Sequence, residues 1–197
     1  MTSPRPRWLR VALGLLAIVL APSPAVAGPF DGSPPAEHPG FLVFENTYSA
    51  RLNAKPEPTD GGRLMTHWQL GYLHHVDERN AWGGGVKLTA DTDGYRVGPV
   101  VRYRRWLSDS VGLDVGVGSY LAGEDYSFEV GFPAPTVDVG VSFDDWVGFH
   151  AGLDGLERGG EGMHLEPYVG IRFGRWLAPV TTVGLGVLIG ATVSTMN

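Results

Sequence analysis

Residues 111–118 read Val-Gly-Leu-Asp-Val-Gly-Val-Gly, and this stretch decides the fold class. Every second residue is apolar and branched, and the residues between them are three glycines and Asp114. Successive side chains of a β-strand point to opposite faces, so the alternation predicts a strand with one apolar and one polar face.

The same period of two recurs along most of the chain. Segments Phe41–Leu52 and Leu64–Val76 alternate less cleanly, and six others alternate well: residues 82–90, 96–104, 137–143, 147–154, 165–173 and 182–191. Together with residues 111–118 they make nine segments, whereas bacterial membrane barrels use an even number of strands. We therefore predict a closed antiparallel up-and-down β-barrel of eight strands with one segment outside the wall. Ten strands are the alternative if Tyr126–Phe132 adds another.

The connections between these segments alternate in length. Short turns are predicted at Asp77–Asn80, Leu107–Ser110, Asp144–Asp145 and Arg175–Pro179, an intermediate one at Asp91–Gly94, and long polar loops at Asn53–Gly62, Gly123–Pro135 and Gly155–Gly162. Membrane barrels have short turns at one end and longer loops at the other. Each short turn also has a Trp close by, which predicts an aromatic girdle at one membrane boundary made by Trp82, Trp106, Trp146 and Trp176.

Alternation alone allows the apolar face to point inward, as in a soluble barrel, or outward to lipid. The polar face is rich in glycine, which weakens a solvated strand but suits a crowded barrel interior. The apolar face is therefore predicted to face lipid. Charged residues of mixed sign can then pair inside the barrel, although a solvated polar face remains the alternative. The predicted lumen-lining residues are Lys87, Arg102, Arg104, Asp114, Asp138, His150, Asp154, Glu166 and Arg172.

The first residues have the layout of a secretory signal peptide. Three arginines precede the apolar run Val11–Ala21, and Ala25-Val26-Ala27 offers a cleavage site. The predicted domains are a signal peptide at 1–27, a flexible Pro-rich lead-in at 28–39 and a β-barrel at 40–197. The chain has no Cys, so disulfides are excluded, and its net charge of −6 without basic clusters argues against nucleic acid as a partner.

Catalytic and metal chemistry have little support in the residues. His150 and Asp154 share a face but lie about 13 Å apart along a strand, so they cannot pair directly. Ser142, on the same face of the preceding strand, keeps a hydrolytic site open as an alternative. Neighbouring His74 and His75 point to opposite faces, so they cannot jointly bind a metal. We predict no catalytic residue, no metal and no cofactor.

The signal peptide, the strand series from Phe41 to Val193 and the stretch Val100–Leu107 resemble the small outer-membrane β-barrel proteins of Gram-negative bacteria, the OmpA-type or porin-like group. The resemblance implies an outer-membrane location, with membrane lipid and the barrel-insertion machinery as partners. It also implies a non-enzymatic role that is structural, adhesive or that of a narrow channel, with no external ligand identified. The chain departs from the group by ending Ser194-Thr195-Met196-Asn197 rather than in an aromatic residue.

Two other functions stay open. One is a soluble secreted or periplasmic barrel that holds a small apolar ligand. The other is a lipid-modifying enzyme of the outer membrane.

Overall fold

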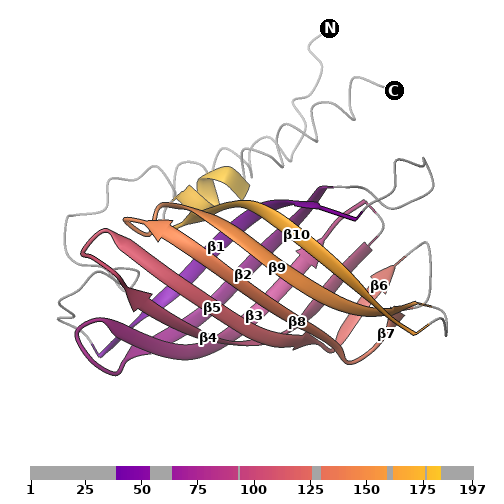
Figure 1. Ribbon diagram of the computed structural model, residues 1–197, viewed down its shortest axis with the longest axis horizontal. Coiled ribbons are helices and arrows are strands. Elements are labelled where there is room, and N and C mark those ends of the chain that lie inside the picture. Colours follow the sequence, from indigo (N-terminus) through magenta and orange to yellow (C-terminus); the bar gives the residue numbers. More distant parts are fainter. Residues whose placement is uncertain are drawn as a thin grey trace, which may run out of the picture.

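Eight long strands close into an antiparallel barrel (Figure 1). The computed structural model describes residues 39–53, 64–92, 94–125, 130–158, 162–175 and 177–182. Consecutive long strands pair with each other, and the last pairs with the first as well as with its predecessor, which closes the wall. This confirms the predicted barrel and its eight strands. They are β1 (Gly40–Arg51), β2 (Leu64–His75), β3 (Asn80–Ala90), β4 (Gly94–Trp106), β5 (Val111–Tyr120), β8 (Ala134–Phe143), β9 (Val147–Arg158) and β10 (Met163–Gly174).

Two short strands, β6 (Ala122–Asp125) and β7 (Val130–Gly131), lengthen the wall at the long-loop end. Strand β6 pairs with β4 and continues β5 after one extra residue, which is the count of a β-bulge. Strand β7 pairs with the end of β9 and precedes β8 along the same side of β9, where the four residues 132–135 span the interval of only two residues of β9. The loop predicted at Gly123–Pro135 is therefore partly strand. The described part of Tyr126–Phe132 does not form a ninth or tenth strand around the barrel.

Two other boundaries differ from the predictions. Strand β9 continues to Arg158, so the first half of the predicted loop Gly155–Gly162 belongs to the wall. Residues 177–182 form a short helix, where a turn and the start of a ninth strand were predicted. Because β10 already pairs with β1, the wall has no place for that strand. The rest of it, the signal peptide and the lead-in up to residue 38 lie outside the described residues.

The apolar face of the wall points outward. Val115, Val139 and Ile171 are 38%, 44% and 46% exposed. Asp114 and Arg172 come from the other face of the same strands and are 0% and 3% exposed. Charged side chains therefore fill the centre of this barrel, and apolar side chains cover its outside.

Glycines on the inward face make room for the side chains opposite them. A Cβ added at Gly152 would lie 2.3 Å from the Tyr168 ring, and one at Gly116 would lie 2.8 Å from Asp138 Oδ1. A small barrel leaves an interior just wide enough for side chains to fill. These positions therefore have no room for a Cβ, as the glycine-rich composition of the polar face indicated.

The turn between β2 and β3 is held by Asp77. Its Oδ1 accepts hydrogen bonds from the backbone N–H of Arg79 and from Asn80 Nδ2, both at 2.8 Å. These bonds favour the carboxylate and lower the pKa of Asp77 below its ordinary value.

Among the described residues, no helix is long and apolar enough to cross a membrane.

Candidate functional site

Among the described residues, charged side chains from many strands meet in the barrel interior. They are organised in three levels along the axis. The level nearest the short turns is centred on Asp114 of β5. The Asp114 carboxylate accepts hydrogen bonds from three arginines, with Arg102 Nε at 3.1 Å, Arg104 Nε at 2.7 Å and Arg172 Nη2 at 2.5 Å. Strands β4 and β10 thus meet on one carboxylate of β5.

A second carboxylate, Glu45 of β1, shares the same three guanidinium groups. Its Oε2 lies 2.5 Å from Arg102 Nη1 and 3.5 Å from Arg172 Nη1, and its Oε1 lies 2.9 Å from Arg104 Nη2. Arg104 Nη1 also donates to Asp145 Oδ1 in the β8–β9 turn at 2.9 Å. The three buried arginines are therefore opposed by three carboxylates, one of which, Asp145, also lies 3.8 Å from Arg175 Nη2.

Sequence reasoning missed Glu45 and Asp145. Glu45 alternates with Leu42, Phe44 and Tyr48 of the predicted apolar face, so its parity already placed it inside. The alternation of β1 is imperfect, which obscures this parity. Asp145 lies in a turn, and periodicity carries no information about a turn residue.

The central level is built around Lys87 of β3. Its Nζ donates to Tyr168 OH at 2.8 Å and to Thr136 Oγ1 at 3.0 Å, and lies 3.4 Å from Asp138 Oδ2. Asp138 Oδ1 in turn lies 3.2 Å from His150 Nε2. The buried ammonium thus has both a charged partner and neutral hydrogen-bond partners.

A chain of hydrogen bonds extends this level across the lumen. His67 Nδ1 lies 2.8 Å from Thr89 Oγ1, which lies 2.8 Å from Tyr120 OH. Tyr120 OH donates to Asp154 Oδ2 at 3.2 Å, and Asp154 Oδ1 accepts from Thr136 Oγ1 at 2.6 Å. Buried polar groups that are satisfied in this way make a core rigid and specific.

The third level lies at the long-loop end and contains two arginines and two acids. Arg51 pairs with Asp91, and Arg51 Nε lies 3.2 Å from Glu166 Oε2. Arg96 Nη2 lies 3.3 Å from Asp91 Oδ2, and Arg96 Nη1 lies 3.8 Å from Glu166 Oε2. Charge is again balanced within the level.

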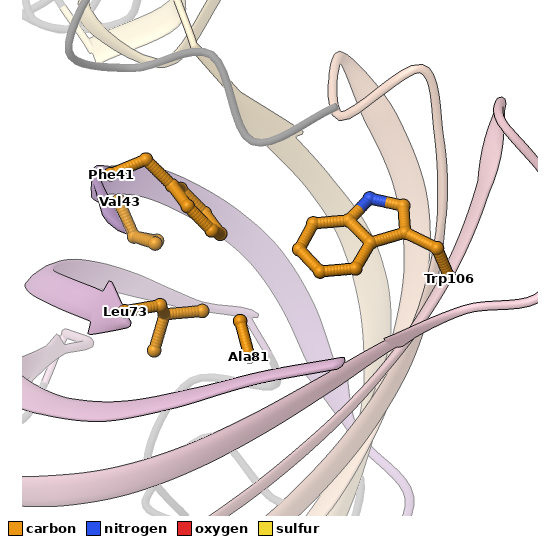
Figure 2. Close-up of a cluster of buried hydrophobic side chains, with 5 residues drawn as sticks. All are labelled: Phe41, Val43, Leu73, Ala81 and Trp106. Atoms are coloured by element: carbon orange, nitrogen blue, oxygen red, sulfur yellow. The ribbon is translucent and has the colours of Figure 1, made fainter. Parts of the chain in front are cut away.

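Apolar side chains close the interior at both ends. Near the short turns, inward-facing side chains from β1, β2, β3 and β4 form a plug of Phe41, Val43, Leu73, Ala81 and Trp106 (Figure 2). At the other end Tyr120, Ala134 and Leu156 are fully buried, with Phe132 packed against them. Apolar side chains therefore pack against the charged interior at both ends of the barrel.

The structure places all nine predicted lumen-lining residues inside the barrel, with exposed fractions of at most the 7% of His150. A lumen wide enough for water would leave such side chains accessible. The described residues therefore enclose a filled interior rather than a water-filled passage.

The predicted girdle is wrong for Trp106. Trp82 and Trp146 are 55% and 39% exposed on the outside, but Trp106 is 3% exposed and lies in the apolar plug. Its ring stacks on His75, with centroids 5.2 Å apart. Trp106 has the same parity as Arg102 and Arg104, so the strand pattern already pointed it inward. Trp176 lies outside the described residues.

The hydrolytic alternative finds no assembled site. His150 pairs with Asp138, whereas Asp154 is bonded to Tyr120 and Thr136. The Ser142 hydroxyl lies 3.4 Å from both the Gly112 carbonyl oxygen and Asp145 Oδ1. His150, Asp154 and Ser142 are thus engaged in three different places. Nor does the described part of the chain hold a group of three or more His, Asp or Glu side chains suited to a metal ion.

Comparison with known proteins gives little further information. No family model matches the chain, and no curated protein matches it. Among solved structures, one match is described as "De novo design of transmembrane beta-barrels". It is 11% identical, with 71% of this chain and 98% of that chain covered and a TM-score of 0.41. At that score the likeness carries no weight, and the faces of this barrel decide what it can do.

Proposed function

We propose that this chain is a non-enzymatic outer-membrane β-barrel of a Gram-negative bacterium, with a structural or adhesive role. One observation carries the proposal: the wall exposes apolar side chains, while the charged side chains of its inward face are buried and paired. Exposed apolar side chains occur on every long strand, for example Leu42, Leu70, Val86, Val101, Val117, Val139, Phe149 and Ile171.

A contiguous apolar surface of this kind marks contact with a membrane or a partner. A strand can cross a bilayer only if its backbone groups are paired, and a closed barrel pairs them all. The long strands have 10 to 13 residues, close to the roughly 9–11 that a tilted membrane strand needs. Length, closure and surface thus support insertion together.

Outward-facing aromatic residues near the short turns support a membrane–water boundary at that end of the barrel. Tyr72, Trp82, Tyr103, Phe143 and Trp146 all lie near the short turns and are at least 39% exposed. Amphipathic aromatic rings favour the level where hydrocarbon meets water. The girdle in this proposal therefore keeps Trp82 and Trp146 and replaces Trp106 with other aromatic residues.

The interior favours a structural role over the other functions. A channel needs an open path. The lumen of this barrel is instead filled by three levels of paired charges, the apolar plug and the Tyr120–Ala134–Leu156 cluster. A carrier of a small apolar ligand needs an apolar cavity, whereas the inward faces here carry ion pairs. The adhesive role is assigned to the long-loop end.

Cell fractionation combined with gel migration tests the proposal. The full chain is expressed in a Gram-negative host, the inner and outer membranes are separated, and each fraction is run with and without boiling. We expect recovery in the outer membrane and a folded band that migrates differently until it is boiled. Recovery in the soluble periplasm without detergent contradicts the proposal, and so does a large conductance of the purified protein in a planar bilayer.

A further inference from the structure

The described helix, residues 177–182, lies against the outside of the wall (Figure 1). It follows β10 along the chain, yet its hydrogen bonds go to β1 and β2. Thr182 Oγ1 accepts from Asn46 Nδ2 of β1 at 2.9 Å and from Trp68 Nε1 of β2 at 3.2 Å. The helix therefore crosses the line where β10 meets β1.

We call this junction of β1 and β10 the closing seam. It is the shortest of the three ladders that these two strands form. Strands β1 and β10 pair from Glu45 to Arg51, seven residues of β1, whereas β1 pairs with β2 over eleven, from Gly40 to Ala50. Strand β10 also pairs with β9 over eleven residues, from Met163 to Phe173. Fewer ladder hydrogen bonds make the closing seam the weaker side of both strands.

Tyr48 of β1 joins the seam and the helix at one side chain. Its ring makes an edge contact with Phe173 of β10, with centroids 6.0 Å apart. Its hydroxyl donates to the backbone carbonyl of Thr181 at 3.0 Å and accepts from Asn46 Nδ2 at 2.8 Å. The helix thus tightens a contact that itself bridges the two strands.

Asn46 shows that the wall is built for this cover. It has the outward parity of β1, where its neighbours Leu42 and Phe44 are apolar, yet it is 0% exposed. A buried amide N–H would be costly on this surface without an acceptor, and Asn46 Nδ2 has two, the hydroxyls of Tyr48 and Thr182. Ala178 of the helix is also 0% exposed, so the two surfaces are in close contact.

We propose that residues 177–182 act as a strap that holds the closing seam between β1 and β10 shut. Its release would open the barrel laterally at this seam before the other junctions of β1 and β10, which are longer. The proposal goes beyond a membrane role and does not depend on it, because it rests on contacts within the chain itself.

Two neighbouring threonines provide the test and its matched control. Thr182→Val removes the hydroxyl that accepts from Asn46 and Trp68 and donates to the Ala178 carbonyl within the helix. Thr181→Val removes a hydroxyl that bonds only to the helix carbonyls of Leu177 and Ala178. We expect Thr182→Val to lower the thermal unfolding midpoint of the purified full chain by roughly 5 °C, with a clearly smaller shift for Thr181→Val.

Disulfides then show whether the effect acts at the seam, since the chain has no Cys of its own. Val169 lies opposite Ala50 across the seam and opposite Ala151 across the β9–β10 junction. Oxidised Ala50→Cys/Val169→Cys should abolish the difference between the two threonine variants, and Ala151→Cys/Val169→Cys should leave it. Disulfide formation is verified by thiol labelling, and the midpoints are measured in whichever medium keeps the chain folded.

Equal shifts for the two threonine variants would overturn the strap. A difference between them that persists in oxidised Ala50→Cys/Val169→Cys would also overturn it. So would a difference that disappears equally in oxidised Ala151→Cys/Val169→Cys. A protein found in the soluble fraction would contradict the membrane proposal but leave this comparison unchanged.

Discussion

Arg172 Nη2 of β10 lies 2.5 Å from Asp114 Oδ2 of β5, and the two strands are separated by β8 and β9 in the wall. The bond therefore reaches across the lumen rather than along the sheet. Asp114 is 0% exposed and also accepts from Arg102 and Arg104. One carboxylate thus ties three arginines into the interior.

Asp114→Ala should therefore be among the most damaging single changes in the chain. It leaves three buried guanidinium groups with one shared carboxylate fewer, and breaking a buried pair from one side costs about 3–5 kcal/mol. Urea unfolding of the purified protein, followed by tryptophan fluorescence, measures the loss. Asp109→Ala, in an exposed turn, is the control and should change stability by less than about 0.5 kcal/mol. Similar losses for both variants would mean that the Asp114 level adds nothing to stability.

Gly152→Ala tests the crowding of the lumen. The added Cβ would lie 2.3 Å from the Tyr168 ring, and Tyr168 OH accepts from Lys87. Overpacking of this kind costs about 1–3 kcal/mol, and displacement of Tyr168 would add the loss of its hydrogen bond. Gly84→Ala is the matched control because its Cβ would meet only the Val100 carbonyl oxygen at 3.4 Å. A stable Gly152→Ala variant alongside a damaged Gly84→Ala variant would reverse the assignment of the two faces.

The two faces of the wall could be predicted from the sequence because they depend on local alternation. Asp114, between Gly112 and Gly116, needs no partner to be placed on one side of its strand. The side that faces inward follows from the same residues, since glycine and mixed charge suit a crowded lumen.

Chain closure could not be predicted in the same way. The alternation of residues 182–191 resembles that of a wall strand, but pairing between β10 and β1 leaves no place for one. Which strand closes a barrel depends on strand number and register, and neither is a local property. The helix at 177–182 was missed for the same reason, and with it the role of Asn46.

The interior partners were predicted as a set but not as pairs. Lys87 and Asp138 were both placed in the lumen, but their contact depends on the relative stagger of β3 and β8. The position of Trp106 was predicted wrongly from local information. Its nearness to a turn suggested the outer girdle, whereas its parity with Arg104 points it inward, and parity is the stronger constraint in a strand.

Trp106→Ala tests the apolar plug. Trp106 is 3% exposed and packs in one cluster with Phe41 and Leu73, so its truncation should cost about 3–5 kcal/mol. Trp82→Ala removes an indole that is 55% exposed on the outer wall and should cost much less in detergent. Heating on a gel until the folded band disappears ranks the two variants. The plug is ruled out as a stabilising feature if the Trp82 variant unfolds first.

A charge on the outer wall separates a membrane barrel from a soluble one. Val139 lies near the middle of β8 and is 44% exposed, so Val139→Arg places a cation near the bilayer midplane if the barrel is inserted. Such a substitution costs a membrane barrel about 2–4 kcal/mol, whereas an exposed position in water tolerates it within about 0.5 kcal/mol. Leu107→Arg, at a short turn and 53% exposed, is the matched control, since a charge there reaches water at either location. Unfolding of both variants in lipid vesicles gives the comparison. We expect a large loss for Val139→Arg and a small one for Leu107→Arg, because only the former charge is held away from water by lipid. Equal, small losses in vesicles would mean that lipid does not cover the middle of this wall.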